Sequence, residues 1–145
     1  MDGLDDPHAR AAVDEVIELH AFFEAWLGGT AQNSDLVFSR LENALAETFS
    51  MVTPDGTKLQ RSQVIGWLRQ AHGAKGSPAP FRIAILEPEP LAVRRPLVVL
   101  RYVEEQSSGG TVTRRRSTAV LDTPAGEGGA ARWLALHETW IGPDR

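Results

Sequence analysis

The chain contains no cysteine in its 145 residues, and this absence removes several kinds of chemistry. Disulfide bonds, zinc sites with thiolate ligands and cysteine nucleophiles are excluded. Long apolar stretches are also lacking, since no run approaches the ~20 residues that a membrane-spanning helix needs. We therefore expect neither a disulfide-stabilised fold nor a membrane partner.

Positive charge is scarce as well, with 15 lysine and arginine residues against 19 acidic residues and a net charge of −4. Nucleic-acid binding depends on the neutralisation of phosphates by basic side chains, so a nucleic-acid partner is not expected. Residues 1–6 are acidic and lack the basic and apolar regions of a signal peptide, which favours a cytoplasmic location. The hydrophobic content of 42% suffices for a core, and the length fits one domain over residues 1–145.

The first half of the chain is expected to be mainly helical, because apolar residues recur there at helical spacing. Asp6 and Ser34 are suitable N-caps, and Gly28 ends the first helix. A short strand at 49–53 and a Pro-Asp-Gly turn at 54–56 precede the third helix. The predicted helices are residues 7–27, 34–48 and 63–72.

From residue 80 onward the pattern indicates strands. Pro88 and Pro90 predict a break in the first of them, and a hairpin turn is expected at 107–110 and a mobile glycine-rich loop at 124–130. The predicted strands are residues 81–87, 91–95, 97–106, 111–122 and 132–141. This order predicts an α+β fold in which N-terminal helices pack on a curved antiparallel sheet.

The last strand, 132–141, has neither glycine nor proline and carries a histidine in its middle. Regular alternation places Trp133 and His137 on one face and Leu136, Glu138 and Trp140 on the other. Neither face has the composition of a simple solvent face. We therefore expect a strand near the centre of the sheet, covered on both sides, and which face lines a pocket stays open.

Three local patterns resemble a known superfamily. They are His20-x-x-Phe-x-x-Trp26-x-x-Gly29, Met51-Val-Thr-Pro-Asp-Gly56 and Trp133-x-x-x-His-Glu-x-Trp140. With the element order, they are similar to the nuclear transport factor 2-like superfamily, and within it to the SnoaL-like proteins of cystatin-like fold. The resemblance implies a cone-shaped half-barrel with a pocket between the sheet and the first helix, and commonly a homodimer joined through sheet faces.

Four residues are candidates for catalysis. His20 lies within the apolar stripe of the first helix, and Glu24 follows one turn later, where a carboxylate could orient the imidazole as a general base. His137 could approach His20 at the pocket wall, and Tyr102 could polarise a ligand carbonyl. The alternatives are a core His20 bonded to a backbone carbonyl, a His137 buried in the sheet or at a dimer face, and a Tyr102 that only packs.

A second set of residues is expected to line the pocket through apolar surface. These ligand-binding candidates are Phe23, Trp26, Met51 and Trp67. Ketosteroid-isomerase-like activity is not expected, because two acids cannot be placed on the pocket face. Arg114, Arg115 and Arg116 are expected to pair across strands with Glu104 and Glu105. The histidine spacing matches no known ligand geometry, so no metal or other cofactor is expected.

These observations support three functional hypotheses. The first is an uncharacterised protein that binds a small, mostly apolar ligand between the first helix and the sheet. The second is an isomerase, dehydratase or hydrolase with a pocket histidine as general base. The third is a homodimeric association module, with contacts from Trp140 and the outer face of the sheet.

Overall fold

A computed structural model describes residues 5–124 and 130–142 and shows three helices packed on a six-stranded sheet. The helices are α1 (Pro7–Gly28), α2 (Asp35–Ala44) and α3 (Arg61–Gln70). The strands are β1 (Leu45–Val52), β2 (Lys58–Gln60), β3 (Phe81–Arg94), β4 (Leu97–Ser108), β5 (Thr111–Asp122) and β6 (Arg132–Trp140). The predicted α+β class is confirmed. The glycine-rich loop expected at 124–130 lies mostly outside the described residues.

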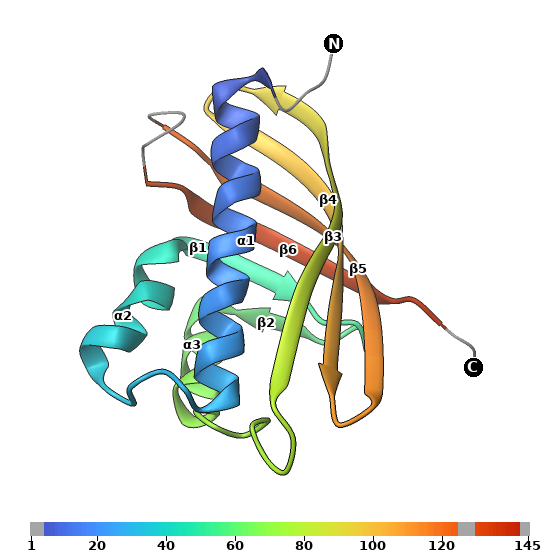
Figure 1. Cartoon of the computed structure of the whole chain (residues 1–145). Coiled ribbons are helices and arrows are strands. Elements are labelled where there is room, and N and C mark those ends of the chain that lie inside the picture. The colour runs from blue at the N-terminus through green and yellow to red at the C-terminus, as the bar shows by residue number, and fades with distance from the viewer. Residues whose placement is uncertain (1–4, 125–129, 143–145) are drawn as a thin grey trace.

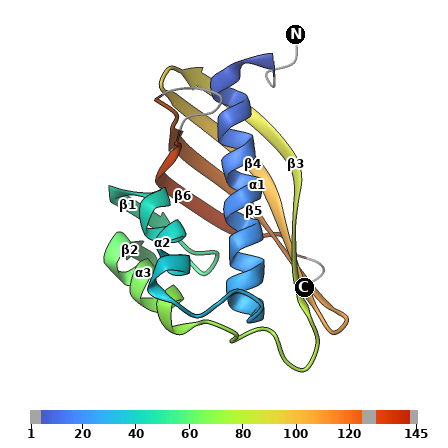
Figure 2. The ribbon, with the colours of Figure 1, turned by 60° about the vertical axis from the view of Figure 1, so that its left-hand side comes forward.

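The strands form one curved sheet in the order β2-β1-β6-β5-β4-β3. Figure 1 shows α1 lying along one face of this sheet, and Figure 2 shows α2 and α3 beside β1 and β2 at one side of it. β6 is central, as expected. The sheet is mixed and not purely antiparallel, because β6 runs parallel to β1 while β3, β4 and β5 form antiparallel pairs. We call the face toward α1 the concave face and the opposite one the convex face.

The ends of α1 and α2 follow the predicted chemistry. The Asp6 carboxylate accepts hydrogen bonds from the backbone N–H groups of His8 and Ala9, and the Ser34 hydroxyl accepts one from Val37. Gly29 has a φ of 84°, a left-handed conformation that glycine adopts without strain, and it terminates α1.

The largest differences from the sequence prediction concern the second helix and the first long strand. The second helix ends at Ala44, because residues from Leu45 onward extend to pair with β6 and β2. β3 is also continuous through Pro88 and Pro90, where its register with β4 shifts and Glu87 takes a φ of 54°. An edge strand accommodates proline in this way, since an outward N–H is not needed for pairing.

The core fills the space between the helices and the concave face. Its largest fully buried side chains include Trp26, Trp133, Tyr102, Leu19, Leu41 and Leu100. Trp26 lies beneath α3, where its indole N–H donates to the carbonyl of Leu68 over 2.7 Å. No described helix has the length and apolar composition needed to cross a membrane.

Candidate functional site

A cavity of about 90 Å³ lies between α1, α3 and the concave face of the sheet. Most of its lining is apolar, with contributions from α1, α2, α3, β1, β3 and β6. Four polar or charged side chains from the sheet also line it: Glu104, Gln106, Arg115 and Glu138. The cavity therefore has an apolar wall and a charged end, an arrangement typical of small-molecule sites.

His20 links the helix to this charged end. Its Nδ1 lies 2.7 Å from the carbonyl oxygen of Val16, and its Nε2 lies 3.2 Å from Oε1 of Glu104. Because a carbonyl only accepts hydrogen bonds, Nδ1 carries a proton. Gln106 donates to the second Glu104 oxygen over 2.7 Å, so both carboxylate oxygens are engaged.

The electrostatics of this pair favour an imidazolium and a carboxylate. Burial alone would lower the pKa of His20, but the neighbouring Glu104 raises it above its usual value. Burial would likewise raise the pKa of Glu104, yet His20 lowers it to about 2. His20 is thus held as the charged partner of Glu104, which does not suit the general-base role expected of it.

Glu138 is the second acid on the concave face, and it is only 5% exposed. Its carboxylate accepts long hydrogen bonds from Arg115 Nη1 at 3.4 Å and from the Ser117 hydroxyl at 3.5 Å. Burial, with the nearby charge of Glu104, raises the pKa of Glu138 to about 6. Glu138 is therefore a group that can take up and release a proton near neutral pH.

Two buried hydrogen-bonding groups at the charged end lack partners among the described residues. They are the Tyr102 hydroxyl and the Nε–H of Arg115. The Tyr102 ring contacts the His20 ring edge to face at 5.7 Å, and burial and the Glu104 charge raise the pKa of Tyr102 well above its usual value. The Arg115 guanidinium lies 4.8 Å from the centre of the Trp140 ring.

The structure brings together some of the expected site residues and separates others. His20, Phe23, Met51 and Trp67 line the cavity. Glu24, Trp26, Tyr102 and His137 do not line it.

Glu24 has a structural contact in place of the expected one with His20. Its carboxylate accepts the backbone N–H of Ile83 over 2.8 Å and so ties α1 to β3. The carboxylate beside His20 belongs to Glu104, for which the sequence predicts an arginine partner on the neighbouring strand. Of the expected cross-strand pairs, Arg114 with Glu105 is present.

His137 is exposed on the convex face, because a β-bulge interrupts the alternation of β6. Leu121 of β5 pairs with Trp133 and Val120 pairs with Ala135, so Leu134 is the extra residue. The bulge places Trp133 on the same face as Leu136 and Glu138. The expected approach of His137 to His20 is therefore wrong.

The local sequence around Glu104 and Glu138 does not by itself predict that both side chains face the cavity. Glu104 and Glu105 are adjacent, and only the register of β4 decides that Glu104 points into the molecule. The expectation that two acids cannot share the pocket face is corrected by Glu104 and Glu138. One signal was available: alternation from Leu100 through Tyr102 reaches Glu104 on the same face.

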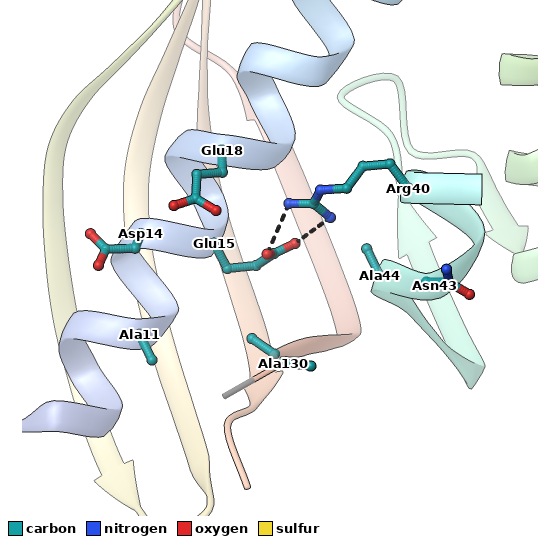
Figure 3. A pocket seen from close by; sticks show the side chains of 9 residues that line it. Ala11, Asp14, Glu15, Glu18, Arg40, Asn43, Ala44 and Ala130 are labelled. Atoms are coloured by element: carbon teal, nitrogen blue, oxygen red, sulfur yellow. Dashed lines mark hydrogen bonds and ion pairs between the residues drawn. The ribbon is translucent and has the colours of Figure 1, made fainter. Parts of the chain in front are cut away.

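A separate groove of about 500 Å³ lies between α1 and α2 (Figure 3). Glu15 points from α1 toward Arg40 of α2, whereas Asp14 points away from it. The Glu15–Arg40 pair is bidentate, at 3.0 and 3.1 Å, and Glu15 also accepts the Trp133 indole N–H at 3.1 Å. These bonds fasten α1 to α2 and β6, which is a structural role.

Within residues 5–124 and 130–142, no group of three or more histidine or acidic side chains is arranged to hold a metal ion.

Solved structures share this fold. An NTF2-like protein of unknown function from Pseudomonas aeruginosa is 30% identical, with a TM-score of 0.80 over 91% of this chain and 99% of that one. A CaMKII hub from S. rosetta has a TM-score of 0.65 at 11% identity, over 91% of this chain and 95% of that one. The NTF2-like resemblance is confirmed.

Sequence relatives include sucrose-phosphatase 1 of Nicotiana tabacum, which is 27% identical over 128 residues. That match covers 88% of this chain, and the chain spans only 30% of the relative's length. A family model described as sucrose-6-phosphate phosphohydrolase C-terminal matches residues 12–142. Because that match covers nearly the whole sequence, the chain belongs to the sucrose-6-phosphate phosphohydrolase C-terminal family and has an NTF2-like fold.

Proposed function

We propose that residues 1–145 form one domain that binds a small, mostly apolar molecule in the cavity between α1 and the sheet. The observation that carries this proposal is the cavity itself, whose apolar wall ends at buried charged side chains. Burial of charge costs free energy unless each charge has a partner within the protein or in a ligand. A group of buried charges at one end of an apolar cavity therefore favours a ligand-binding role.

The size of the cavity limits the ligand. Pockets for drug-sized molecules measure roughly 300–1,000 Å³, and this cavity measures about 90 Å³. Trp67 lines it and is 56% exposed, so its indole can shift outward without losing much buried surface. A ligand of a few heavy atoms, or a longer one that displaces Trp67, fits this geometry.

The sugar-phosphate chemistry in the relatives' names does not carry the proposal. Those proteins are much longer than the part that this chain matches. The cavity wall is formed by side chains such as Phe23, Met51 and Leu136. Such a wall is better suited to an apolar ligand than to a sugar ring with several hydroxyl groups.

A cavity-filling variant tests the binding role. Hexan-1-ol serves as the probe, and its binding is followed by NMR through the indole resonance of Trp67. Leu136→Phe adds volume inside the cavity and should weaken binding at least tenfold, because overpacking excludes the probe. Val112→Phe is the control, since Val112 is 50% exposed outside the cavity. Equal affinity in the wild type and Leu136→Phe would contradict the proposal.

Association of two copies through the convex face is a second candidate role. Ala92, Val99, Val120 and Ala135 stand in one row across β3, β4, β5 and β6, and each is half-buried. This row is an apolar strip on the convex face, near one end of the paired strands. The shared fold with a protein described as a hub supports association as a role for such a face.

An acidic substitution in this strip tests the second role. Val120→Asp introduces a charge that a sheet-to-sheet contact would have to bury, so the dimer expected of the wild type should become a monomer. Leu36→Asp is the control, because Leu36 is 83% exposed on α2. Sedimentation velocity measures the outcome. A wild-type monomer would remove this candidate.

A further inference from the structure

The charged end of the cavity adjoins a groove of about 250 Å³ at the turn end of the β4–β5 hairpin. Gln106 lines both spaces and joins them. The groove is rich in hydroxyl groups, and no described lining residue is acidic. Its hydroxyl side chains include Ser77, Ser108, Thr111 and Thr113. A ligand in the cavity can therefore extend a polar group toward a surface of hydrogen-bond donors.

Lys75 supplies the positive charge of this groove. Its ammonium lies 5.4 Å from the centre of the Phe81 ring and 3.5 Å from the side-chain oxygen of Gln106. Its backbone N–H donates to the carbonyl of Leu27 over 2.8 Å, which fixes this residue against the end of α1. Two contacts thus hold the ammonium beside the groove, and one backbone hydrogen bond fixes the main chain of Lys75.

A buried donor at the charged end of the cavity needs an acceptor. The Nε–H of Arg115, which lines the cavity, is buried without a partner among the described residues. An unsatisfied buried donor costs about 1–3 kcal/mol. An oxygen atom of a ligand can accept from Arg115 and remove this cost.

The charged side chains around the cavity and the groove also favour an anionic ligand. Three cations, His20, Arg115 and Lys75, face two carboxylates, Glu104 and Glu138. Burial and the repulsion of Arg115 lower the pKa of Lys75. An anion near Lys75 and Arg115 would relieve this repulsion.

We propose that the ligand of the cavity is an amphipathic anion, with an apolar body in the cavity and one carboxylate or phosphate monoester held by Arg115, Lys75 and the groove hydroxyls. This inference rests on the proposed function and adds the chemical class of the ligand. The body contacts the wall formed by Phe23, Met51 and Leu136. The head group lies at the Gln106 side of the cavity.

Three probes with one tail and different head groups test the inference. They are hexanoate, hexyl phosphate and hexan-1-ol, titrated by calorimetry at pH 7.5 and low salt. We expect at least one anion to bind tenfold or more tightly than the alcohol and to weaken as salt rises. A preference between the two anions distinguishes a carboxylate ligand from a phosphorylated one.

Lysine variants locate the head group. Lys75→Met keeps the aliphatic stem over Phe81 and should lose about tenfold in affinity for the preferred anion, without effect on hexan-1-ol. Lys58→Met is the matched control, because Lys58 is the other lysine of the chain and is exposed on β2. Thr113→Val offers a second, isosteric variant in the groove.

The outcomes separate this inference from the proposed function. Equal binding of hexan-1-ol and both anions would overturn the anionic class and leave the apolar cavity role intact. Anion binding that is unchanged in both Lys75→Met and Thr113→Val would also overturn it. Failure of all three probes to bind would remove the proposed function together with the inference.

Discussion

At the scale of single residues, the site depends on pairs that are distant in sequence. His20 lies between the carbonyl of Val16, one turn earlier, and the carboxylate of Glu104, which is 84 positions away. Helical periodicity predicts the first contact and the inward position of His20. Glu24 is the nearer carboxylate in sequence, yet it bonds to the Ile83 backbone because β3 runs beside α1. The chemistry of His20 is therefore decided by strand register.

Glu138 should make stability depend on pH. Its pKa is 4.5 in the unfolded reference and about 6 in the folded protein, so the folded state binds the proton more tightly. The resulting stabilisation is complete below pH 4.5 and is lost as the pH rises through 6, by about 2 kcal/mol in total. Glu138→Gln cannot titrate, so this decline should be absent from its unfolding free energies.

Urea denaturation from pH 4.5 to 7 measures this difference. Glu47→Gln is a suitable control, because Glu47 is exposed on β1. The wild type and Glu138→Gln are compared at each pH. Parallel pH profiles for these two proteins would show that Glu138 titrates normally.

At the scale of secondary-structure elements, β6 shows what periodicity cannot predict. Strict alternation puts Trp133 with His137, but the extra residue Leu134 moves Trp133 to the face of Leu136 and Glu138. The bulge exists because β6 must match β5 on one side and β1 on the other, where the register also shifts. The sequence of the strand alone does not specify its register with either neighbouring strand.

The two tryptophans of β6 should differ in their energetic contribution. Trp133 is 1% exposed, so Trp133→Ala should destabilise the fold by about 3–5 kcal/mol through loss of packing. Trp140 is 36% exposed, so Trp140→Ala should cost about 1 kcal/mol. Urea unfolding of both variants gives the comparison. Similar losses at the two positions would contradict the difference in burial between the two side chains.

At the scale of the whole molecule, the connection from α3 to β3 packs against the end of α1. Gly73 and Lys75 donate backbone hydrogen bonds to the carbonyls of Trp26 and Leu27, each over 2.8 Å. A Cβ atom at Gly76 would lie 2.1 Å from the carbonyl oxygen of Gly28. Only glycine allows this approach, which also positions Lys75 beside the groove.

Gly76→Ala should therefore destabilise the protein by about 1–3 kcal/mol, because backbone must move to admit the methyl group. Gly66→Ala is the matched control, since its Cβ would meet open space on α3. That change should stabilise the protein by about 0.5–1 kcal/mol through helix propensity. Thermal unfolding measures whether each variant has a lower or a higher melting temperature than the wild type. Stabilisation by Gly76→Ala would refute the close approach.

Local patterns predict most of the elements, the caps at Asp6 and Ser34, the α+β class and the central place of the last strand. These features depend on contacts within a few residues or on one repeating period, which can be read directly from the sequence. The end of α2, the bulge at Leu134 and the meeting of His20, Glu104 and Glu138 follow instead from tertiary contacts. Each of these depends on which strands become neighbours and in what register, and such pairings are set by the packing of the whole chain.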